Sequence, residues 1–213
     1  MILIPVKNLS GAKQRLAGVL DQQRRTELAR AMLEDVLAAV TAVPSRPPVM
    51  VVTSDAFAAS LARRHGFLVL DDPENPGESG AIEMATRAAE AAGADFTLVL
   101  PGDIPLVTAS EIRLVLDAMP ERGTVFVRAA DARGTNAVLR RPASLFPLRF
   151  GNDSFLPHLA SARATGLPVE VREAPGIALD IDRPDDLARL LAHPVRTGTQ
   201  RLLTAWHFSA TLK

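Results

Sequence analysis

The chain has 213 residues, 47% of them hydrophobic, which suits one sizeable α/β domain or two small ones. Its 24 basic and 24 acidic residues give a formal net charge of zero, which argues against a nucleic-acid polymer or an anionic membrane as the main partner. The absence of cysteine excludes disulfides, thiolate zinc sites and cysteine nucleophiles. The N-terminus lacks the features of a signal peptide, and no apolar run reaches the ~18 residues of a membrane span. These features predict a cytoplasmic globular protein.

Strand and helix patterns alternate along the first half of the chain. Short apolar runs predict buried strands at residues 2–6, 49–53, 67–70 and 96–100. Amphipathic spacing predicts helices at about residues 22–43, 57–65 and 81–92. Such alternation predicts an α/β fold with a mixed, mostly parallel sheet and helices on both faces.

A basic loop, residues 7–16, follows the first strand. Lys7, Lys13 and Arg15 supply three cations, and Gly11 adds flexibility. Lysine offers a point charge and arginine a planar fork, so the loop could cradle a triphosphate. Neither the Walker pattern nor the G-x-G-x-x-G pattern is present, so neither a P-loop protein nor a dinucleotide binder is indicated. The alternative is a solvated basic loop.

The stretch of residues 96–106 is the most informative in the chain. Asp103 lies just past the carboxyl end of the predicted strand, where open α/β sheets bind ligands. Pro101 and Pro105 restrict the backbone on either side. A carboxylate held in this way is suited to a hard cation such as Mg²⁺. The alternative is that Asp103 caps a helix or turns the chain.

The remaining elements are predicted by local signals. Thr108 and Glu111 form a capping-box pattern that starts a helix reaching about residue 119. Strands are predicted at residues 124–127, 134–139 and 169–171, and a helix from about residue 153 to 165. The loop of residues 72–80 either lines the site or is solvent-exposed.

Two further patterns point to ligands. Gly151 and Ser154 lie at the start of a predicted helix, where backbone amides favour anions, although Asp153 could simply cap that helix. Asp180 and Asp182 are two residues apart on a predicted extended segment, so their carboxylates share one face while Ile181 points into the core. Two such carboxylates repel unless a cation or a proton lies between them. The alternative is that Asp182 caps the helix that Pro184 begins.

No domain boundary, repeat or low-complexity segment is evident. We therefore predict a single domain over residues 1–195 and a C-terminal tail, residues 196–213, that is either weakly structured or a packing arm. The apolar stripe of the first long helix is wide enough to be either core or the face of a homodimer.

Together these pieces resemble the guanylyltransferases of deazaflavin coenzyme (F-420) biosynthesis, which belong to the nucleotidyltransferases with a Rossmann-like glycosyltransferase-A fold. The resemblance extends to about residue 193. Its motifs, in order, are Ile4–Lys7, Ala12–Leu16, Met32–Leu37, Leu100–Pro105, Gly134–Ala137, Phe150–Phe155 and Leu179–Asp182. It implies transfer of GMP from GTP to the phosphate of 2-phospho-L-lactate, phosphoenolpyruvate or 3-phospho-D-glycerate, with release of pyrophosphate.

The resemblance also implies roles for individual residues. Asp103, Asp180 and Asp182 would bind two Mg²⁺ ions. The basic loop would hold phosphates, and the second half of the chain would hold the acceptor. The predicted catalytic residues are Lys13, Arg15 and Asp103, and the predicted substrate-binding residues are Lys7, Thr135, Gly151 and Ser154. The predicted nucleotide-binding residues are Pro5, Val6, Gly77, Ser79 and Gly102. Nucleotidyl transfer needs charge neutralisation and in-line positioning more than a protein base, so no histidine is required and all four are interpreted as structural.

One motif departs from the family pattern. Members commonly carry Gly-Leu-Asn before the third helix, whereas residues 77–81 of this chain are Gly-Glu-Ser-Gly-Ala. The resemblance therefore implies guanine preference less strongly than nucleotidyl transfer, and backbone amides near Gly77 and Ser79 could take the place of the missing asparagine. The alternatives are a cytidylyltransferase of the molybdopterin or sugar-phosphate type, a non-catalytic nucleotide-binding protein and a structural scaffold. The first is disfavoured because the fingerprint L-x-G-G-x-S-x-R is missing, and the second because Lys13 and the three aspartates are all present.

Overall fold

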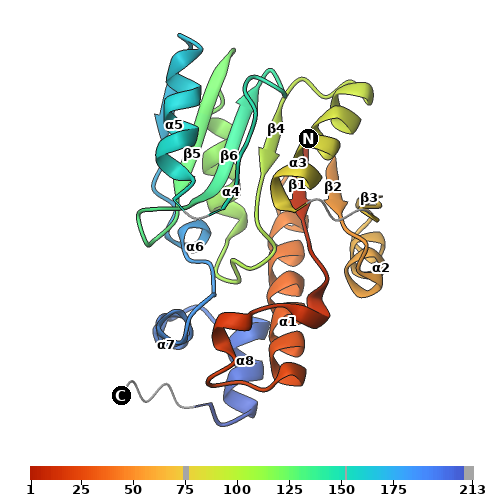
Figure 1. Ribbon diagram of the computed structural model, residues 1–213, viewed down its shortest axis with the longest axis vertical. Coiled ribbons are helices and arrows are strands. Elements are labelled where there is room, and N and C mark those ends of the chain that lie inside the picture. The colour runs from red at the N-terminus through yellow and green to blue at the C-terminus, as the bar shows by residue number, and fades with distance from the viewer. Residues whose placement is uncertain (74–76, 152, 209–213) are drawn as a thin grey trace.

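A seven-stranded sheet in the order β3-β2-β1-β4-β6-β5-β7 forms the centre of the molecule, with helices on both faces (Figure 1). The computed structural model describes residues 1–73, 77–151 and 153–208. β6 runs antiparallel to both of its neighbours, and the other pairs are parallel, which confirms the predicted mixed, mostly parallel sheet. The strands are β1 Ile2–Pro5, β2 Val49–Val52, β3 Leu68–Leu70, β4 Thr97–Val99, β5 Gly123–Arg128, β6 Thr135–Arg141 and β7 Val169–Val171.

Every helix that the sequence predicts is present, with small differences at its ends, and the structure adds helices at residues 175–178 and 198–205. The 3-10 turns are η1 Leu9–Gly11 and η2 Gln14–Leu16, and the helices are α1 Gln22–Thr41, α2 Ala56–Arg64, α3 Glu78–Ala91, α4 Ala109–Asp117, α5 Phe155–Ala164, α6 Pro175–Ala178, α7 Pro184–Ala192 and α8 Gly198–Ala205. The capping box of Thr108 and Glu111 is formed as predicted. α3 begins at Glu78 rather than near residue 81. The short helix α6, which precedes the extended segment of Asp180 and Asp182, was not predicted.

Both faces of the sheet are buried, because successive side chains of a strand point to opposite sides. In β1, Ile2 and Ile4 pack with α1, α2 and α4 in one core cluster. Leu3 joins Phe126 and the helices α3 and α5 in the other. Helices therefore cover both faces of the sheet. The loops at the carboxyl ends of β1 and β4 lie at the edge where open α/β sheets bind ligands.

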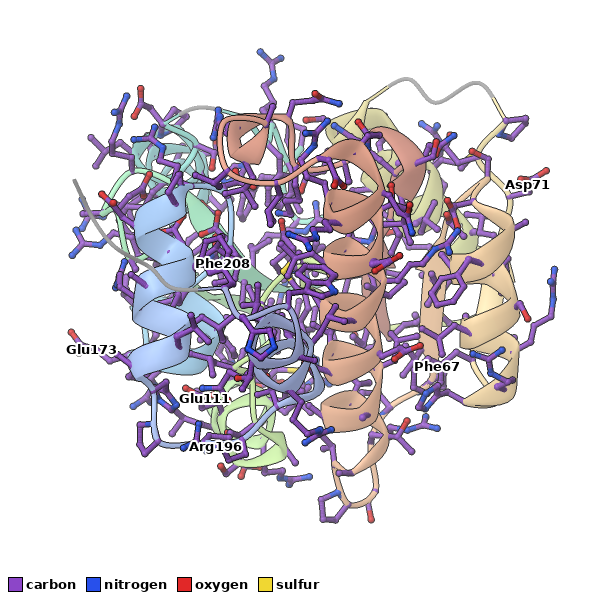
Figure 2. All side chains as sticks on the ribbon, turned by 90° about the horizontal axis from the view of Figure 1, so that it is seen from below. Phe67, Asp71, Glu111, Glu173, Arg196 and Phe208 are labelled. Carbon is purple, nitrogen blue, oxygen red and sulfur yellow. The ribbon has the colours of Figure 1, made fainter. Side chains whose placement is uncertain are left out.

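The C-terminal tail is a packing arm as far as the structure describes it. α8 lies beside α1 (Figure 1), and the Asp35 carboxylate accepts hydrogen bonds from Gly198 N (2.8 Å), Thr199 N (2.8 Å) and Thr199 Oγ1 (2.6 Å) at its start. Beyond α8, Trp206 and Phe208 pack on the core; Phe208 is labelled in the view from below (Figure 2). The last part of the predicted tail and the middle of the predicted loop of residues 72–80 lie outside the described residues.

None of the helices in the described ranges has the length and apolarity needed to cross a membrane.

Candidate functional site

Two adjoining cavities, of about 520 and 370 Å³, lie where the loops after β1 and β4 meet the loops around α5 and α7. Lys7, Glu78, Pro101, Asp103 and Asp182 line both cavities, so they mark the junction between them. Of the other predicted site residues, the larger cavity is lined by Arg15, Thr135, Gly151, Ser154 and Asp180, and the smaller by Pro5, Val6, Lys13 and Gly102. The structure thus brings nearly all predicted residues to one place.

Lys13 connects the basic loop to the acidic residues at the junction. Its Nζ lies 2.5 Å from Asp103 Oδ2 and 2.8 Å from Asp182 Oδ1, and only 7% of its side chain is exposed. Its backbone is left-handed (φ 57°), a conformation that costs a non-glycine residue roughly 1–2 kcal/mol and that the two ion pairs offset. Arg15 Nη1 lies 3.1 Å from Asp182 Oδ2. Lys13 is therefore buried in an ion-pair cluster, so the alternative of a solvated loop does not describe it, while Lys7 and Arg15 are exposed.

The two acidic segments are joined through the backbone. Ile181 N donates to the carbonyl oxygen of Asp103 (3.1 Å), and the Ile181 side chain is fully buried, as predicted. Asp186 Oδ2 accepts from the backbone nitrogens of Asp182 and Arg183, so Asp186 caps α7 and the Asp182 carboxylate stays available. Capping does not account for Asp182, since its carboxylate faces Lys13.

Asp180 is held by a residue to which the sequence analysis gave no role. Asn136, 7% exposed, has its Nδ2 within hydrogen-bond distance of Asp180 Oδ1 (3.0 Å) and of the carbonyl oxygens of Ile177 (3.0 Å) and Ala178 (2.9 Å), which share its two N–H protons. One amide group on β6 thereby fixes both the end of α6 and the Asp180 carboxylate. The signal was present in the sequence, because Asn136 lies inside the motif Gly134–Ala137.

The charges of the cluster depend on their surroundings. Burial lowers the pKa of Lys13, but the carboxylates of Asp103 and Asp182 outweigh burial and raise it above its ordinary value. Burial raises the pKa of Asp182, yet Lys13 and Arg15 bring it below the usual range. The pKa of Asp180 is raised, chiefly by burial and then by the neighbouring carboxylates, against the hydrogen bond from Asn136. A cation beside Asp180 would therefore favour its ionised form.

We expect Asn136→Ala to lower the free energy of unfolding by about 1–3 kcal/mol, because buried acceptors would lose their donor. Urea denaturation of the variant measures this loss. Gln23→Ala is the matched control, since its amide bonds only Glu27 on the exposed surface of α1, and it should change stability by less than about 0.5 kcal/mol. Equal stability of the two variants would contradict the role of Asn136 in holding the end of α6 and the Asp180 carboxylate.

Glu78 is a further site residue that the sequence analysis missed. It begins α3, borders both cavities, and its carboxylate forms no hydrogen bond or ion pair with any residue of the described ranges. Burial first, and then the charge of Asp103, raise its pKa to about 7. The sequence signal was the acidic residue within the loop that departs from the family pattern.

We expect Glu78→Gln to stabilise the protein increasingly between pH 4.5 and 8. The folded-state pKa of about 7 exceeds the ordinary value of 4.5, so the wild type loses stability as pH rises through this window, by up to about 3 kcal/mol. The glutamine variant lacks this loss. Urea unfolding at pH 4.5, 6 and 8, without nucleotide or divalent ions, measures the difference. The control Glu83→Gln, on the exposed face of α3, should keep the wild-type pH dependence; parallel curves for Glu78→Gln and wild type would refute the prediction.

The far side of the larger cavity carries neutral donors. Ser154 Oγ accepts a hydrogen bond from Thr135 N (3.1 Å), and Thr135 Oγ1 lies 3.0 Å from His158 Nδ1. Gly151 lines the same wall with φ +143°, a conformation that favours glycine. Asp153 does not cap α5; its carboxylate pairs with Arg133, and α5 starts at Phe155 without a side-chain cap.

Two predicted nucleotide-binding residues line neither cavity. Gly77 precedes α3 with φ +89°, and the Ser79 hydroxyl accepts from Phe150 N (2.8 Å), which ties α3 to the loop before α5. Both flank Glu78, so the side chain that reaches the cavities from this turn is the carboxylate between them. Their direct contact with a nucleotide stays a prediction.

The arrangement bears on metal binding as well. Asp103, Asp180 and Asp182 offer the oxygen ligands that Mg²⁺ prefers. In the described residues no group of three or more acidic or histidine side chains is drawn together as a metal-ligand set, and the space between Asp103 and Asp182 holds the Lys13 ammonium. The donor chemistry fits a divalent cation that would share or replace the position of this ammonium.

Comparison with solved structures defines the class of fold. A protein described as a nucleotide-diphospho-sugar transferase from Desulfovibrio desulfuricans superposes with a TM-score of 0.75 at 20% identity, covering 96% of this chain and 93% of that one. The CMP:2-keto-3-deoxy-manno-octonic acid synthetase gives a TM-score of 0.58 at 14% identity, covering 98% and 99%. The chain has the nucleotide-diphospho-sugar transferase fold.

The family is defined by sequence. The model "Guanylyl transferase CofC like" matches residues 1–213. A phosphoenolpyruvate guanylyltransferase of Rubrobacter xylanophilus is 40% identical over 191 residues, 89% of this chain and 92% of that protein. A 2-phospho-L-lactate guanylyltransferase of Methanothermobacter thermautotrophicus is 31% identical over 97% of this chain and 91% of that protein. This chain belongs to the CofC-like guanylyl transferase family and is a nucleotidyltransferase, which confirms the resemblance seen in its motifs.

Proposed function

We propose that the protein transfers GMP from GTP to the phosphate of phosphoenolpyruvate and releases pyrophosphate. The observation that carries the proposal is the cluster of Lys13, Asp103 and Asp182 at the junction of two cavities. A reaction between two anionic substrates needs two adjoining spaces with cation-binding groups where they meet. Phosphoenolpyruvate is favoured over 2-phospho-L-lactate because the relatives that carry its name are the more similar ones, at 35–40% identity against 31%.

The chemistry follows from the charges at the junction. A phosphate oxygen of the acceptor attacks the α-phosphorus of GTP, and the bond to the oxygen that bridges the α- and β-phosphates breaks, so pyrophosphate leaves with the electron pair. Lys7 and Arg15 would hold the phosphates, and Thr135, Gly151 and Ser154 would hold the acceptor, since all five line the larger cavity. The nucleophile is already an anion, so no protein base is needed.

Magnesium is part of the proposal. Asp103, Asp180 and Asp182 would hold it through their carboxylate oxygens. When bound, Mg²⁺ would supply positive charge to the reacting phosphates and the leaving pyrophosphate. From the family resemblance, the proposal includes a role for this reaction in the biosynthesis of coenzyme F-420. Guanine selection without the Gly-Leu-Asn motif would rest on residues of the turn before α3.

Pyrophosphate release by the purified protein tests the proposal. GTP, ATP and CTP are each combined with phosphoenolpyruvate, 2-phospho-L-lactate and 3-phospho-D-glycerate, with and without Mg²⁺. We expect release only with GTP, Mg²⁺ and phosphoenolpyruvate. Release with another acceptor alone would reassign the substrate. Release with CTP or ATP in place of GTP would show that the enzyme selects a different base, as the altered sequence of residues 77–81 allows. If no pair releases pyrophosphate, the proposal is overturned.

A further inference from the structure

The buried His158 lies directly behind the predicted acceptor-binding wall. It sits on α5, is 1% exposed, and stacks on Phe126 with ring centroids 6.5 Å apart. Its two ring nitrogens have different partners. Nε2 lies 2.8 Å from the backbone nitrogen of Arg149, and Nδ1 lies 3.0 Å from Thr135 Oγ1.

These contacts determine which ring nitrogen carries the proton. A backbone N–H can only donate, so Nε2 of His158 accepts the bond from Arg149. Burial, with a smaller contribution from Arg140, lowers the pKa of His158 to about 4, so the imidazole is neutral near pH 7. A neutral imidazole with Nε2 as acceptor has its proton on Nδ1. His158 therefore donates to Thr135 Oγ1.

The direction of that bond sets the direction of the next one. Thr135 Oγ1 receives a proton from His158, so its own hydroxyl proton is left to be donated. Ser154 Oγ likewise receives the backbone N–H of Thr135 and keeps its own proton for donation. Neither hydroxyl has an acceptor among the residues that the structure describes, and both side chains line the larger cavity. Two oriented donors therefore face the space that Arg15 also lines.

We propose that His158 is a positioning residue that fixes the Thr135 hydroxyl as a hydrogen-bond donor to an anionic oxygen of the phosphorylated acid. Both hydroxyls are oriented as donors before a ligand binds: His158 orients that of Thr135, and the backbone N–H of Thr135 orients that of Ser154. Such preorganisation favours an acceptor that brings only lone pairs, such as a carboxylate or a phosphate, and disfavours a ligand that presents a hydroxyl donor at this point. The inference rests on the proposed function in taking the phosphorylated acid as the ligand.

Two conservative variants separate positioning from structural support. In His158→Asn the amide nitrogen takes the place of Nδ1 and still donates to Thr135, whereas in His158→Gln the amide takes the place of Nε2 and keeps only the contact with Arg149. Each variant loses one hydrogen bond of the native pair. Their midpoints of urea denaturation should therefore be similar, and both should fold.

Steady-state kinetics on the full chain test the proposal. We expect His158→Gln and Thr135→Val each to raise the KM for the acceptor about tenfold or more, and the double variant to show no further rise. The KM for GTP should stay within about twofold in all of them. His158→Asn should keep the acceptor KM within about threefold of wild type. Equal acceptor KM values in the Asn and Gln variants, or parallel rises in both KM values, would overturn the positioning role.

The same variants identify the end of the acceptor that is bound. Pyruvate carries the carboxylate alone and methyl phosphate the phosphate alone, so inhibition constants for both are measured in wild type and His158→Gln. The constant that rises in the variant marks the bound group, and no change in either would count against the proposal. If the wild type transfers no nucleotide with any acceptor, the proposed function has failed. If the wild type is active and the variants equal it, the inference alone has failed.

Discussion

Replacing Asp103 by asparagine is expected to lower kcat/KM for guanylyl transfer by about 10²–10³-fold or more, with the fold intact. The asparagine side chain has the same size, and the hydrogen bond from Ile181 N to the backbone carbonyl of residue 103 would remain. The variant would lose one of the proposed magnesium ligands, a negative charge that lies 2.5 Å from the Lys13 ammonium. Lys13 would still pair with Asp182, so stability should change little. Pyrophosphate release at saturating Mg²⁺, together with circular dichroism, measures both effects.

Asp117→Asn is the control for this experiment. Asp117 pairs with Arg113 on the exposed face of α4, so its loss removes a similar charge without touching the site. Its activity should lie within about twofold of wild type, as expected of an exposed pair. A wild-type rate for Asp103→Asn would contradict the assignment of Asp103 to the catalytic centre.

The second large effect is expected for Lys13→Met. Lys13 is the buried cation between Asp103 and Asp182, so the variant should lose about 10²–10³-fold in kcat/KM. Its thermal stability without divalent ions should also fall, because Asp103 and Asp182 would lose the cation between them and only Asp182 would keep an ion pair, with Arg15. Added Mg²⁺ should then raise the Tm of the variant more than that of wild type, since the ion no longer competes with the ammonium.

Thermal unfolding across a Mg²⁺ titration checks the competition. Arg87→Met, which removes an exposed cation paired with Glu83, should respond to Mg²⁺ as wild type does. A smaller response of Lys13→Met than of wild type would mean that Lys13 helps to hold the ion in place and does not compete with it.

Several parts of the fold could be predicted because their signals are local. The stripe of Leu28, Met32, Val36 and Val40 has the spacing of one helix face, and all four side chains are fully buried in α1. Thr108 caps α4 through contacts that span only three residues. Asp103 follows an apolar strand and lies at its carboxyl end, as the general rule for α/β sheets predicts. None of these required knowledge of the rest of the chain.

Other features depended on contacts between distant segments. The basic loop was recognised, but the Lys13–Asp182 ion pair joins residues 169 positions apart, and local sequence does not indicate which carboxylates a lysine will meet. Asn136 acts on Asp180 across 44 positions; the motif Gly134–Ala137 singles out the residue, but the local sequence does not indicate its partner. The short helix α6 was missed because Asn136 binds its last carbonyls and Glu111 Oε1 accepts from Gly176 N (2.6 Å), both tertiary interactions.

By itself, the sequence determined the α/β class, the family, and the identities of the carboxylates and cations of the site, because periodicity, proline and glycine positions and motif order are properties of the chain. Only the tertiary structure decided that β6 enters antiparallel between β4 and β5, that Glu78 reaches the cavity in place of its neighbours, and that His158 stands behind Thr135. Strand order and side-chain proximity are set by packing over the whole core, where the burial of many apolar groups outweighs any single local preference.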